Sequence, residues 1–357
     1  MEDKERQIAM IEALSNAYGV SGFEQEVTAL AERWIDHQEY ETVSDAMGNL
    51  IIRQKKVRKG PAVLLDAHSD EVGFMVQAIR PDGTMTFLPL GGWSAATLSA
   101  QKVRVRTRRN EYIPGIIAAR PVHFMNEQQR HQLPRIEDMV IDVGSCSRYQ
   151  TMEELEVGIG APVVPDVRCE VDRKRDLFFG KAMDCRIGVA ALLETLRRCR
   201  NNTTTSISAC LSSQEEVGER GIRTAMNQLQ GEVAIVFEGC PADDTFNPEW
   251  MAQTCLGKGP MLRHMDRSMI AHPGWMQAAL QLAARRGIPV QEAVRSGGGN
   301  NGAVIQQCGS GIATLVIGIP VRYIHSHHGV CSYADYEAAV QLACALIETL
   351  PTLDLHG

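Results

Sequence analysis

The sequence predicts an α/β fold, a mostly parallel sheet covered by helices, interrupted by a smaller β-rich domain. Strand-like and helix-like stretches alternate before residue 72 and after residue 164, which is typical of a parallel sheet covered by helices. Between these positions, short strand-like runs separated by turn signals such as Pro81-Asp82-Gly83 dominate, and helical periodicity is weak. We therefore expect one discontinuous domain of residues 1–71 and 165–357 and an inserted domain of residues 72–164.

The first part of the chain predicts two helices and a buried strand. Apolar residues recur at helical spacing between Gln7 and Tyr18. Ser21 is followed three residues later by Glu24, a capping-box pattern that predicts a second helix running to about residue 38. The stretches 48–55 and 61–70 follow, and the continuous apolar run 62–65 is typical of a buried parallel strand.

The alternation of helices and strands returns after residue 178. Stretches with helical character alternate there with short apolar runs, so each strand is followed by a connection long enough to reach a parallel neighbour. The helices are expected at residues 185–200, 221–229, 274–287 and 332–350, and the strands at residues 205–213, 233–239 and 312–320.

Composition and charge favour a globular protein of the cytoplasm. The 357 residues are 44% hydrophobic and 22% charged, with a net charge of −7, so we expect no nucleic-acid partner. No apolar run approaches the roughly 20 residues that cross a bilayer, and the N-terminus lacks the pattern of a secretory signal, so we expect no membrane partner. The ten cysteines form no CxxC pairs and are expected to be free in a reducing cytoplasm.

Acidic and histidine side chains follow the ends of several expected strands. The carboxyl ends of parallel strands meet at one edge of a sheet, so these side chains are expected to converge there. Histidines together with carboxylates suit divalent cations such as Zn²⁺, and two such metals can activate a water and polarise a carbonyl oxygen. The residues concerned are His68, Asp70, Asp184, Glu215, Glu216, Glu238 and His325.

Glu215 and Glu216 are neighbouring carboxylates at the end of an expected strand. Adjacent carboxylates repel each other, and nearby cations would remove that repulsion. A two-metal centre needs one carboxylate that bridges both metals and another that binds no metal and takes a proton from the attacking water. One glutamate of this pair would then be a ligand while its neighbour is the base.

Each of these positions also has a purely structural interpretation. His68 and Asp70 could form a hydrogen-bonded pair, because residues i and i+2 of an extended chain share a face. The same carboxylate could instead stand behind a metal-bound histidine. Asp184 could be a helix N-cap, and the two glutamates could be solvated. We interpret His327 and His328 as parts of a polar loop. The joint occurrence of the other residues at strand and helix ends favours the metal centre.

Four stretches, DAHSDEVGFMV, GKAMDCRIGVAALLE, SSQEEVGERG and RYIHS, resemble in this order the dinuclear-metal aminopeptidases that form tetrahedral dodecamers. That family includes glutamyl aminopeptidases and FrvX-type putative aminopeptidases, and the resemblance covers nearly the whole chain. It implies a fold of the co-catalytic zinc exopeptidase type with a PDZ-like dimerisation domain inserted. It also implies two divalent metal ions per subunit (Zn²⁺ before Co²⁺ or Mn²⁺), short peptide substrates, and a homo-oligomer, the dodecamer.

The resemblance implies a role for each candidate residue in releasing N-terminal residues from peptides. Asp184 would bridge the two metals, and Glu215 would be the general base and acid. The other implied roles are binding of one metal by His68 and Glu238, binding of the second metal by Glu216 and His325, and orientation of His68 by Asp70.

The sequence departs from the family pattern beside the metal centre and in two loops. The family commonly has aspartate where this chain has Glu238, and a second aspartate where it has Cys185. Asn300 and Asn301 replace a Thr-Asp pair, and the loop around Asp243 differs as well. These altered loops motivate one alternative, a deacylase or amidase acting on a small N-substituted metabolite. A second alternative is a metal-binding oligomer without turnover. The presence of Glu215 argues against the latter.

Overall fold

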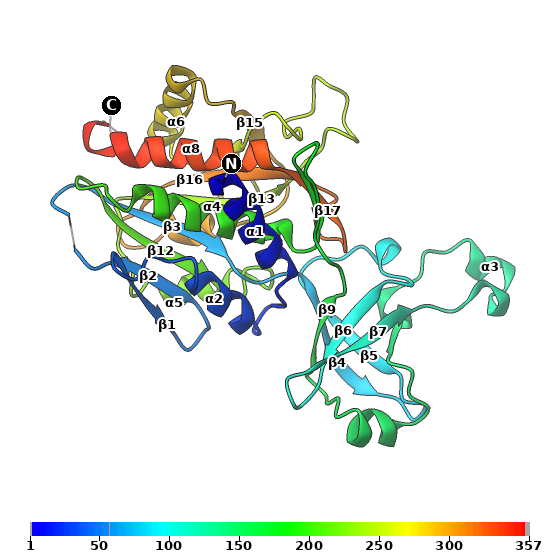
Figure 1. Ribbon diagram of the computed structural model, residues 1–357. Helices are drawn as coiled ribbons and strands as arrows, with labels where there is room; N and C mark the ends of the chain where they lie inside the picture. The colour runs from blue at the N-terminus through cyan, green and yellow to red at the C-terminus, as the bar shows by residue number, and fades with distance from the viewer. Residues whose placement is uncertain (1, 57, 354–357) are drawn as a thin grey trace.

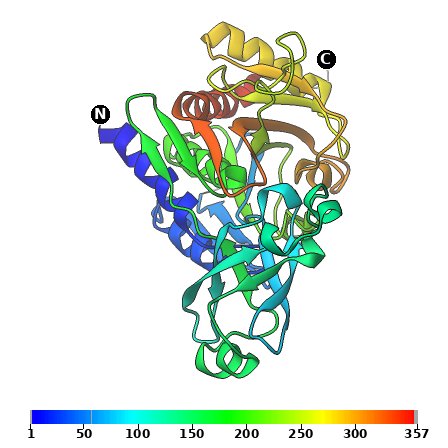
Figure 2. The same ribbon diagram turned by 90° about the vertical axis from the view of Figure 1, so that its right-hand side faces the viewer.

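The computed structural model describes residues 2–56 and 58–353 of the chain. It contains an 11-stranded sheet flanked by helices and a closed barrel of strands that projects from one end of the sheet (Figures 1 and 2). Each part has its own hydrophobic core, and the two cores share no buried residue.

The large sheet is parallel at its centre and antiparallel at its flanks. β12, β3, β13 and β16 lie side by side in parallel. β2 and β1 extend the sheet on one side by antiparallel pairing, and β17, β11 and β10 extend it on the other. The strands are β1 (Tyr40–Ser44), β2 (Leu50–Gln54), β3 (Ala62–His68), β10 (Glu170–Asp172), β11 (Leu177–Gly180), β12 (Ser206–Ser212), β13 (Val233–Pro241), β14 (Met261–Met265), β15 (Gln291–Val294), β16 (Ala313–Arg322) and β17 (Gly329–Ser332).

The expectation of a mostly parallel sheet therefore holds for the central strands and for the pair β14–β15, and the sheet as a whole is mixed. The connections between β1 and β2 and between β16 and β17 are short, at residues 45–49 and 323–328. Connections of this length join antiparallel neighbours, because a parallel neighbour requires a crossover of about a dozen residues or more.

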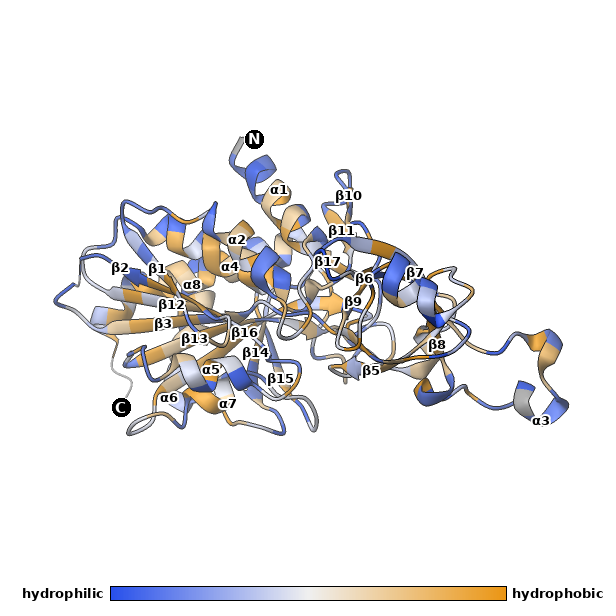
Figure 3. Ribbon diagram, turned by 90° about the horizontal axis from the view of Figure 1, so that it is seen from below, coloured by the Kyte–Doolittle hydropathy of each residue, from blue (hydrophilic) through white to orange (hydrophobic). Residues whose placement is uncertain are grey.

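Helices cover both faces of the sheet. α4 packs on β3 and β13, with α1 and α8 beside it. Figure 3 shows α5, α6 and α7 on the opposite face from α1, α2 and α4. None of the helices within the described residues is long and apolar enough to cross a membrane. The helices are α1 (Glu2–Asn16), α2 (Gln25–Glu32), α3 (Glu127–Arg130), α4 (Met183–Cys199), α5 (Arg220–Ala225), α6 (Pro273–Arg286), α7 (Gly302–Ile305), α8 (Tyr333–Thr349) and the short turns η1 (Ala95–Thr97), η2 (Val122–Phe124), η3 (Ile136–Asp138), η4 (Gln150–Glu154) and η5 (Leu350–Thr352).

The start of the second helix differs from the capping-box prediction. α2 begins at Gln25 with Glu24 as its N-cap residue, and no side chain caps it. The Ser21 hydroxyl instead donates a hydrogen bond of 2.6 Å to Asp70, a residue distant in sequence. The prediction was wrong because a tertiary contact takes the hydroxyl that the local pattern assigned to the helix.

The projecting barrel is built from antiparallel strands in the closed order β4-β5-β8-β7-β6-β9. Its core is apolar and includes Phe74, Val105 and Ile141. The expected β-rich texture is present between Gly73 and Pro165, while the PDZ-like label and the domain limits stay predictions. The barrel strands are β4 (Gly73–Ile79), β5 (Met85–Leu90), β6 (Lys102–Arg106), β7 (Tyr112–Ala118), β8 (Val140–Asp142) and β9 (Pro162–Pro165).

Candidate metal centre

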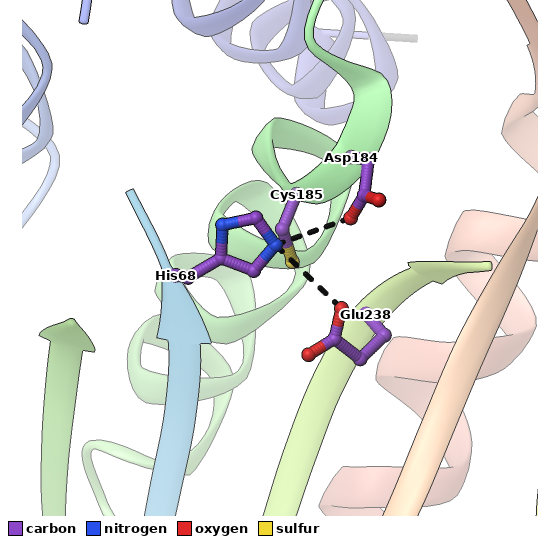
Figure 4. A group of neighbouring side chains, drawn as sticks. All are labelled: His68, Asp184, Cys185 and Glu238. Atoms are coloured by element: carbon purple, nitrogen blue, oxygen red, sulfur yellow. Dashed lines mark hydrogen bonds and ion pairs between the residues drawn. The ribbon is translucent and has the colours of Figure 1, made fainter. Parts of the chain in front are cut away.

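Segments that are distant in sequence bring acidic and histidine side chains together at the carboxyl edge of the parallel strands. Parallel strands that start on one side of a sheet end on the other, so whatever follows them gathers at one edge. Figure 4 shows three of these side chains converging from β3, α4 and β13. In chain order the residues are His68 at the end of β3, Asp184 at the start of α4, Glu215 and Glu216 after β12, Glu238 within β13, and His325 after β16.

Asp184 lies between two imidazole rings. Its Oδ1 is 3.1 Å from Nε2 of His68, and its Oδ2 is 3.2 Å from Nε2 of His325. The other nitrogen of each ring faces acceptors. Nδ1 of His68 is 3.2 Å from the carbonyl oxygen and 3.3 Å from Oδ1 of Asp70, and Nδ1 of His325 is 2.9 Å from the carbonyl oxygen of Gly92. Metal-binding histidines are commonly held in this way, with the second nitrogen fixed by a carboxylate or a carbonyl.

Asp184 does not cap α4. The N-cap residue of α4 is Ala182, no side chain makes a cap hydrogen bond there, and the two carboxylate oxygens of Asp184 face the histidines instead. The structural interpretation of Asp184 as an N-cap is therefore wrong.

Two buried glutamates complete a group of donors on each side of Asp184. Oε2 of Glu238 is 3.7 Å from Nε2 of His68, and Oε2 of Glu216 is 3.5 Å from Nε2 of His325. The other oxygen of each glutamate is buried and has no hydrogen-bond partner. Buried polar atoms normally have partners, so these two carboxylates fit a site that receives a cation.

The electrostatics of the site also fit a cation. Burial raises the pKa of Glu216 and of Glu238 well above the ordinary value, and it raises the pKa of Glu215 to about 8. Burial alone would lower the pKa of His325, but Asp184 and Glu216 raise it to about 9. A bound divalent cation would favour ionised carboxylates and neutral imidazoles, which reverses both tendencies.

Glu215 and Asp70 lie close to this group and differ in their surroundings. Glu215 is within reach of a cation that His68 and Glu216 could hold, and its side chain lines the adjoining cavity. Asp70 is fully buried and accepts hydrogen bonds from the backbone N–H groups of Glu215 and Glu216, at 3.0 and 3.2 Å. It therefore contacts both a predicted ligand and the loop that carries the glutamate pair.

A cavity of about 680 Å³ opens beside the candidate metal residues. Asp184, Glu216 and His325 line one part of it, and the glycines 297–299 line another. Arg263 also lines the cavity; its side chain donates to Asp266 at 3.0 Å. The cavity has room for a small peptide next to the acidic cluster.

Polar side chains of the two loops that depart from the family pattern form hydrogen bonds with other residues of the protein. Asn300 donates to Asp266 at 2.8 Å, and Asn301 donates to Asp66 at 2.8 Å; both asparagines are buried. Asp243 accepts from the backbone of Thr254 at 3.0 Å and pairs with Arg295. These hydrogen bonds and the ion pair therefore fix the conformation of the two loops.

The sequence placed Cys185 beside the metal centre without predicting its contacts, and it did not predict the burial of His327. Sγ of Cys185 lies within 4.8 Å of donor atoms of His68, Asp184 and Glu238, and it hydrogen bonds to the carbonyl oxygen of Phe237 at 3.1 Å. His327 was expected in a polar loop, but it is 2% exposed and its ring lies 5.3 Å from that of Trp93. The polar residues around His327 in the sequence do not predict that its ring is buried against the barrel.

Comparisons with known proteins identify the family of the chain. A sequence profile described as M42 glutamyl aminopeptidase matches residues 48–342. The putative aminopeptidase FrvX of Escherichia coli K12 is 32% identical over 96% of this chain and 95% of its own length. The crystal structure of a TET aminopeptidase from a marine sediment Thaumarchaeota archaeon superposes with a TM-score of 0.92, at 35% identity, over 98% of this chain and 97% of that one. The TET1 peptidase of Pyrococcus horikoshii, which can assemble into a tetrahedron or a large octahedral shell, has a TM-score of 0.85 at 26% identity and covers 96% of this chain and 99% of its own.

Proposed function

The chain belongs to the M42 glutamyl aminopeptidase family, and from that premise we propose that it releases N-terminal residues from short peptides with the help of two divalent metal ions. Peptidases of this family are metal-dependent, and the acidic and histidine cluster is a candidate site for the metal. The number of metals, their identity and the roles of single residues are part of the proposal.

The observation that carries the proposal is the position of Asp184 between two histidines. Each oxygen of this carboxylate faces a different imidazole, and each imidazole has a buried glutamate beside it. His68 and Glu238 would hold one cation, Glu216 and His325 would hold the other, and Asp184 would be shared. Two cations held in this way supply Lewis-acid polarisation of a peptide carbonyl and lower the pKa of a water molecule.

Glu215 would move the proton during hydrolysis. It would accept a proton from the attacking water as the new C–O bond forms, and it would give that proton to the leaving amine as the C–N bond breaks. Without metal, burial raises the pKa of this carboxyl to about 8; bound cations would lower it and favour the ionised form, which can accept the proton. Asp70 would keep the ring of His68 oriented through the contact at Nδ1.

The donor set favours Zn²⁺, with Co²⁺ and Mn²⁺ as the alternatives. Imidazole nitrogen with carboxylate oxygen suits zinc and its borderline neighbours. Glu238 has one more methylene than the aspartate that is usual in the family at that place, which changes the reach of this ligand.

The test is to replace Glu215 by Gln and Asp184 by Asn, and to measure both turnover and metal content per chain. Glu215→Gln should keep its metal and lower kcat by about 10²–10⁴-fold, the range for loss of a general base. Asp184→Asn should lose metal as well as activity. Wild-type turnover in Glu215→Gln would remove the role of Glu215, and full metal content in Asp184→Asn would remove the shared ligand.

The substrate class is tested with a peptide-library digest run beside a panel of N-acyl amino acids. Release of single N-terminal residues supports the aminopeptidase, and cleavage of the N-acyl amino acids alone supports the deacylase or amidase. Full metal occupancy without hydrolysis of any short peptide supports the metal-binding oligomer. The altered loops motivated the deacylase or amidase, and Asn300, Asn301 and Asp243 in those loops form hydrogen bonds with other protein groups.

We also propose that the chain forms a large homo-oligomer, the dodecamer, in which the barrel is the dimerisation domain. The support is the similarity to the TET1 peptidase of Pyrococcus horikoshii. A native mass measurement decides the number of subunits. A location in the cytoplasm stays a prediction.

A further inference from the structure

We propose that Ser21 and Glu24 are positioning residues that fix the backbone turn carrying Glu215 and Glu216. This inference rests on the proposed function, because it concerns the orientation of the proposed base. Neither residue lines the cavity, and both belong to a segment near the N-terminus, about 190 residues before the glutamate pair in the sequence.

The segment that contains these residues is tied to the loop after β3. Val20 and Glu71 form a parallel bridge. The N–H of Glu71 donates to the carbonyl of Gly19 at 2.9 Å, and the N–H of Gly19 donates to the carboxylate of Glu71 at 3.1 Å. These contacts place Ser21 directly beside Asp70.

Ser21 holds the carboxylate that binds the glutamate turn. Its hydroxyl donates to Oδ2 of Asp70 at 2.6 Å, and both side chains are buried. The same carboxylate accepts from the N–H of Glu215 through Oδ1 and from the N–H of Glu216 through Oδ2. The bond from Ser21 therefore restricts rotation of the group to which two successive amides are attached.

Glu24 holds the residue that precedes the pair. Its Oε1 accepts from the N–H of Gln214 at 3.1 Å and from the N–H of Gly22 at 2.7 Å, and the side chain is 1% exposed. Gln214 has a φ of +54°, in the left-handed region that non-glycine residues seldom adopt. Such a conformation persists when its surroundings fix it, and Glu24 supplies a contact that does so.

This turn decides where the two glutamates point. In an extended chain, successive side chains face opposite sides, so an extended Glu215–Glu216 pair could send only one carboxylate into the cavity. Both residues line the cavity here. The backbone N–H groups of three successive residues, 214 to 216, donate hydrogen bonds to the carboxylates of Glu24 and Asp70. Glu24 belongs to the N-terminal segment, and Asp70 is restrained by Ser21 of that segment.

The test uses the full-length, metal-loaded protein and single variants from the two separate contacts. With metal in excess, Ser21→Ala and Glu24→Ala should keep the wild-type KM while kcat falls by about tenfold to a hundredfold, as expected for a displaced catalytic group. Both variants should need a higher metal concentration for half-maximal activity, because the same turn carries the proposed ligand Glu216. Ser21→Thr keeps the hydroxyl and Glu24→Gln keeps an acceptor oxygen, so both should restore most of kcat. Hydrogen exchange of the amides 214–216, measured by mass spectrometry, should accelerate in the two alanine variants only.

Ser332→Ala is the matched control. Ser332 is 5% exposed, as Ser21 is, and its hydroxyl accepts one hydrogen bond at the start of α8, outside the cavity lining. Unchanged kcat in both alanine variants, or a fall no larger than in Ser332→Ala, overturns the proposal. If Glu215→Gln keeps wild-type turnover, the assignment of the base fails instead. If Glu215→Gln is inactive while Ser21→Ala and Glu24→Ala are normal, only the positioning role fails.

Discussion

The barrel and the carboxyl edge of the sheet bury polar groups in opposite ways. Within the described residues between Gly73 and Pro165, the buried polar side chains are Thr107 and Thr151, which are uncharged and hydrogen bonded. At the edge of the sheet the buried polar side chains include a crowded group of ionisable ones: His68, Asp70, Glu71, Lys181, Arg186 and Glu238.

This difference indicates which part of the molecule is arranged for stability and which for chemistry. A buried carboxylate without a partner destabilises a fold, so a cluster of them marks a functional site more often than a structural one. The barrel contains no such cluster among its described residues. Substitutions in its core should therefore change stability, and substitutions at the sheet edge should change chemistry and pH dependence.

The largest effect on stability is expected in the barrel core. Ile141 is fully buried in β8, and Ile141→Ala should lower the free energy of unfolding by about 2–5 kcal/mol through lost burial and a residual cavity. Metal content and kcat per folded chain should stay unchanged. Urea unfolding and metal analysis of the same preparation check this, and loss of bound metal in the folded variant would break the comparison.

A smaller effect is expected from pH at the sheet edge. Burial, with a contribution from Asp70, raises the pKa of Glu24 from 4.5 to about 7. The folded protein holds this proton more tightly than the unfolded chain does, so the stability gained is fully present below pH 4.5 and is lost as pH rises to about 7. The loss amounts to about 3 kcal/mol.

Glu24→Gln serves as the reference for this pH dependence, because glutamine has no proton to lose. The difference in unfolding free energy between the wild type and Glu24→Gln should shift against the wild type between pH 4.5 and pH 7.5. Urea unfolding of the metal-free proteins at several pH values measures it. A difference that is independent of pH would show that Glu24 titrates normally.

The smallest expected effect is an increase in the free energy of unfolding. In the metal-free protein, Glu238→Gln removes a buried carboxylate whose ionised form is disfavoured, and it should raise the free energy of unfolding by about 1 kcal/mol. Added zinc should reverse the order, because only the wild type keeps the full donor set and is stabilised by binding. Thermal unfolding with and without zinc tests this, and a metal-free variant less stable than the wild type would contradict it.

Much of the site could be predicted because its residues follow apolar runs that form the central parallel strands. His68, the glutamate pair and Glu238 each lie at or near the end of such a run, and strand direction alone brings these ends together. The site roles themselves stay predictions, because geometry brings donors together without showing what each of them does.

The parts that escaped prediction depend on contacts between distant segments. Ser21 has the local pattern of a helix cap, and nothing within ten residues of it shows that its hydroxyl bonds to Asp70. Likewise, the strands of the inserted region could be recognised from their composition and turns, but their closure into a barrel depends on pairing between β4 and β9, which are far apart in the chain. Local periodicity carries no information about either contact.

The hydrogen bond between His325 and Gly92 links the candidate metal centre to the barrel. Gly92 lies in the segment that joins β5 to β6, so the carbonyl that holds the imidazole of His325 comes from the projecting part of the molecule. A shortened chain without residues 73–165 would keep every acidic and imidazole side chain of the candidate metal centre, but the ring of His325 would lose its hydrogen bond to Gly92. Removal of the barrel would therefore not leave the candidate metal centre intact.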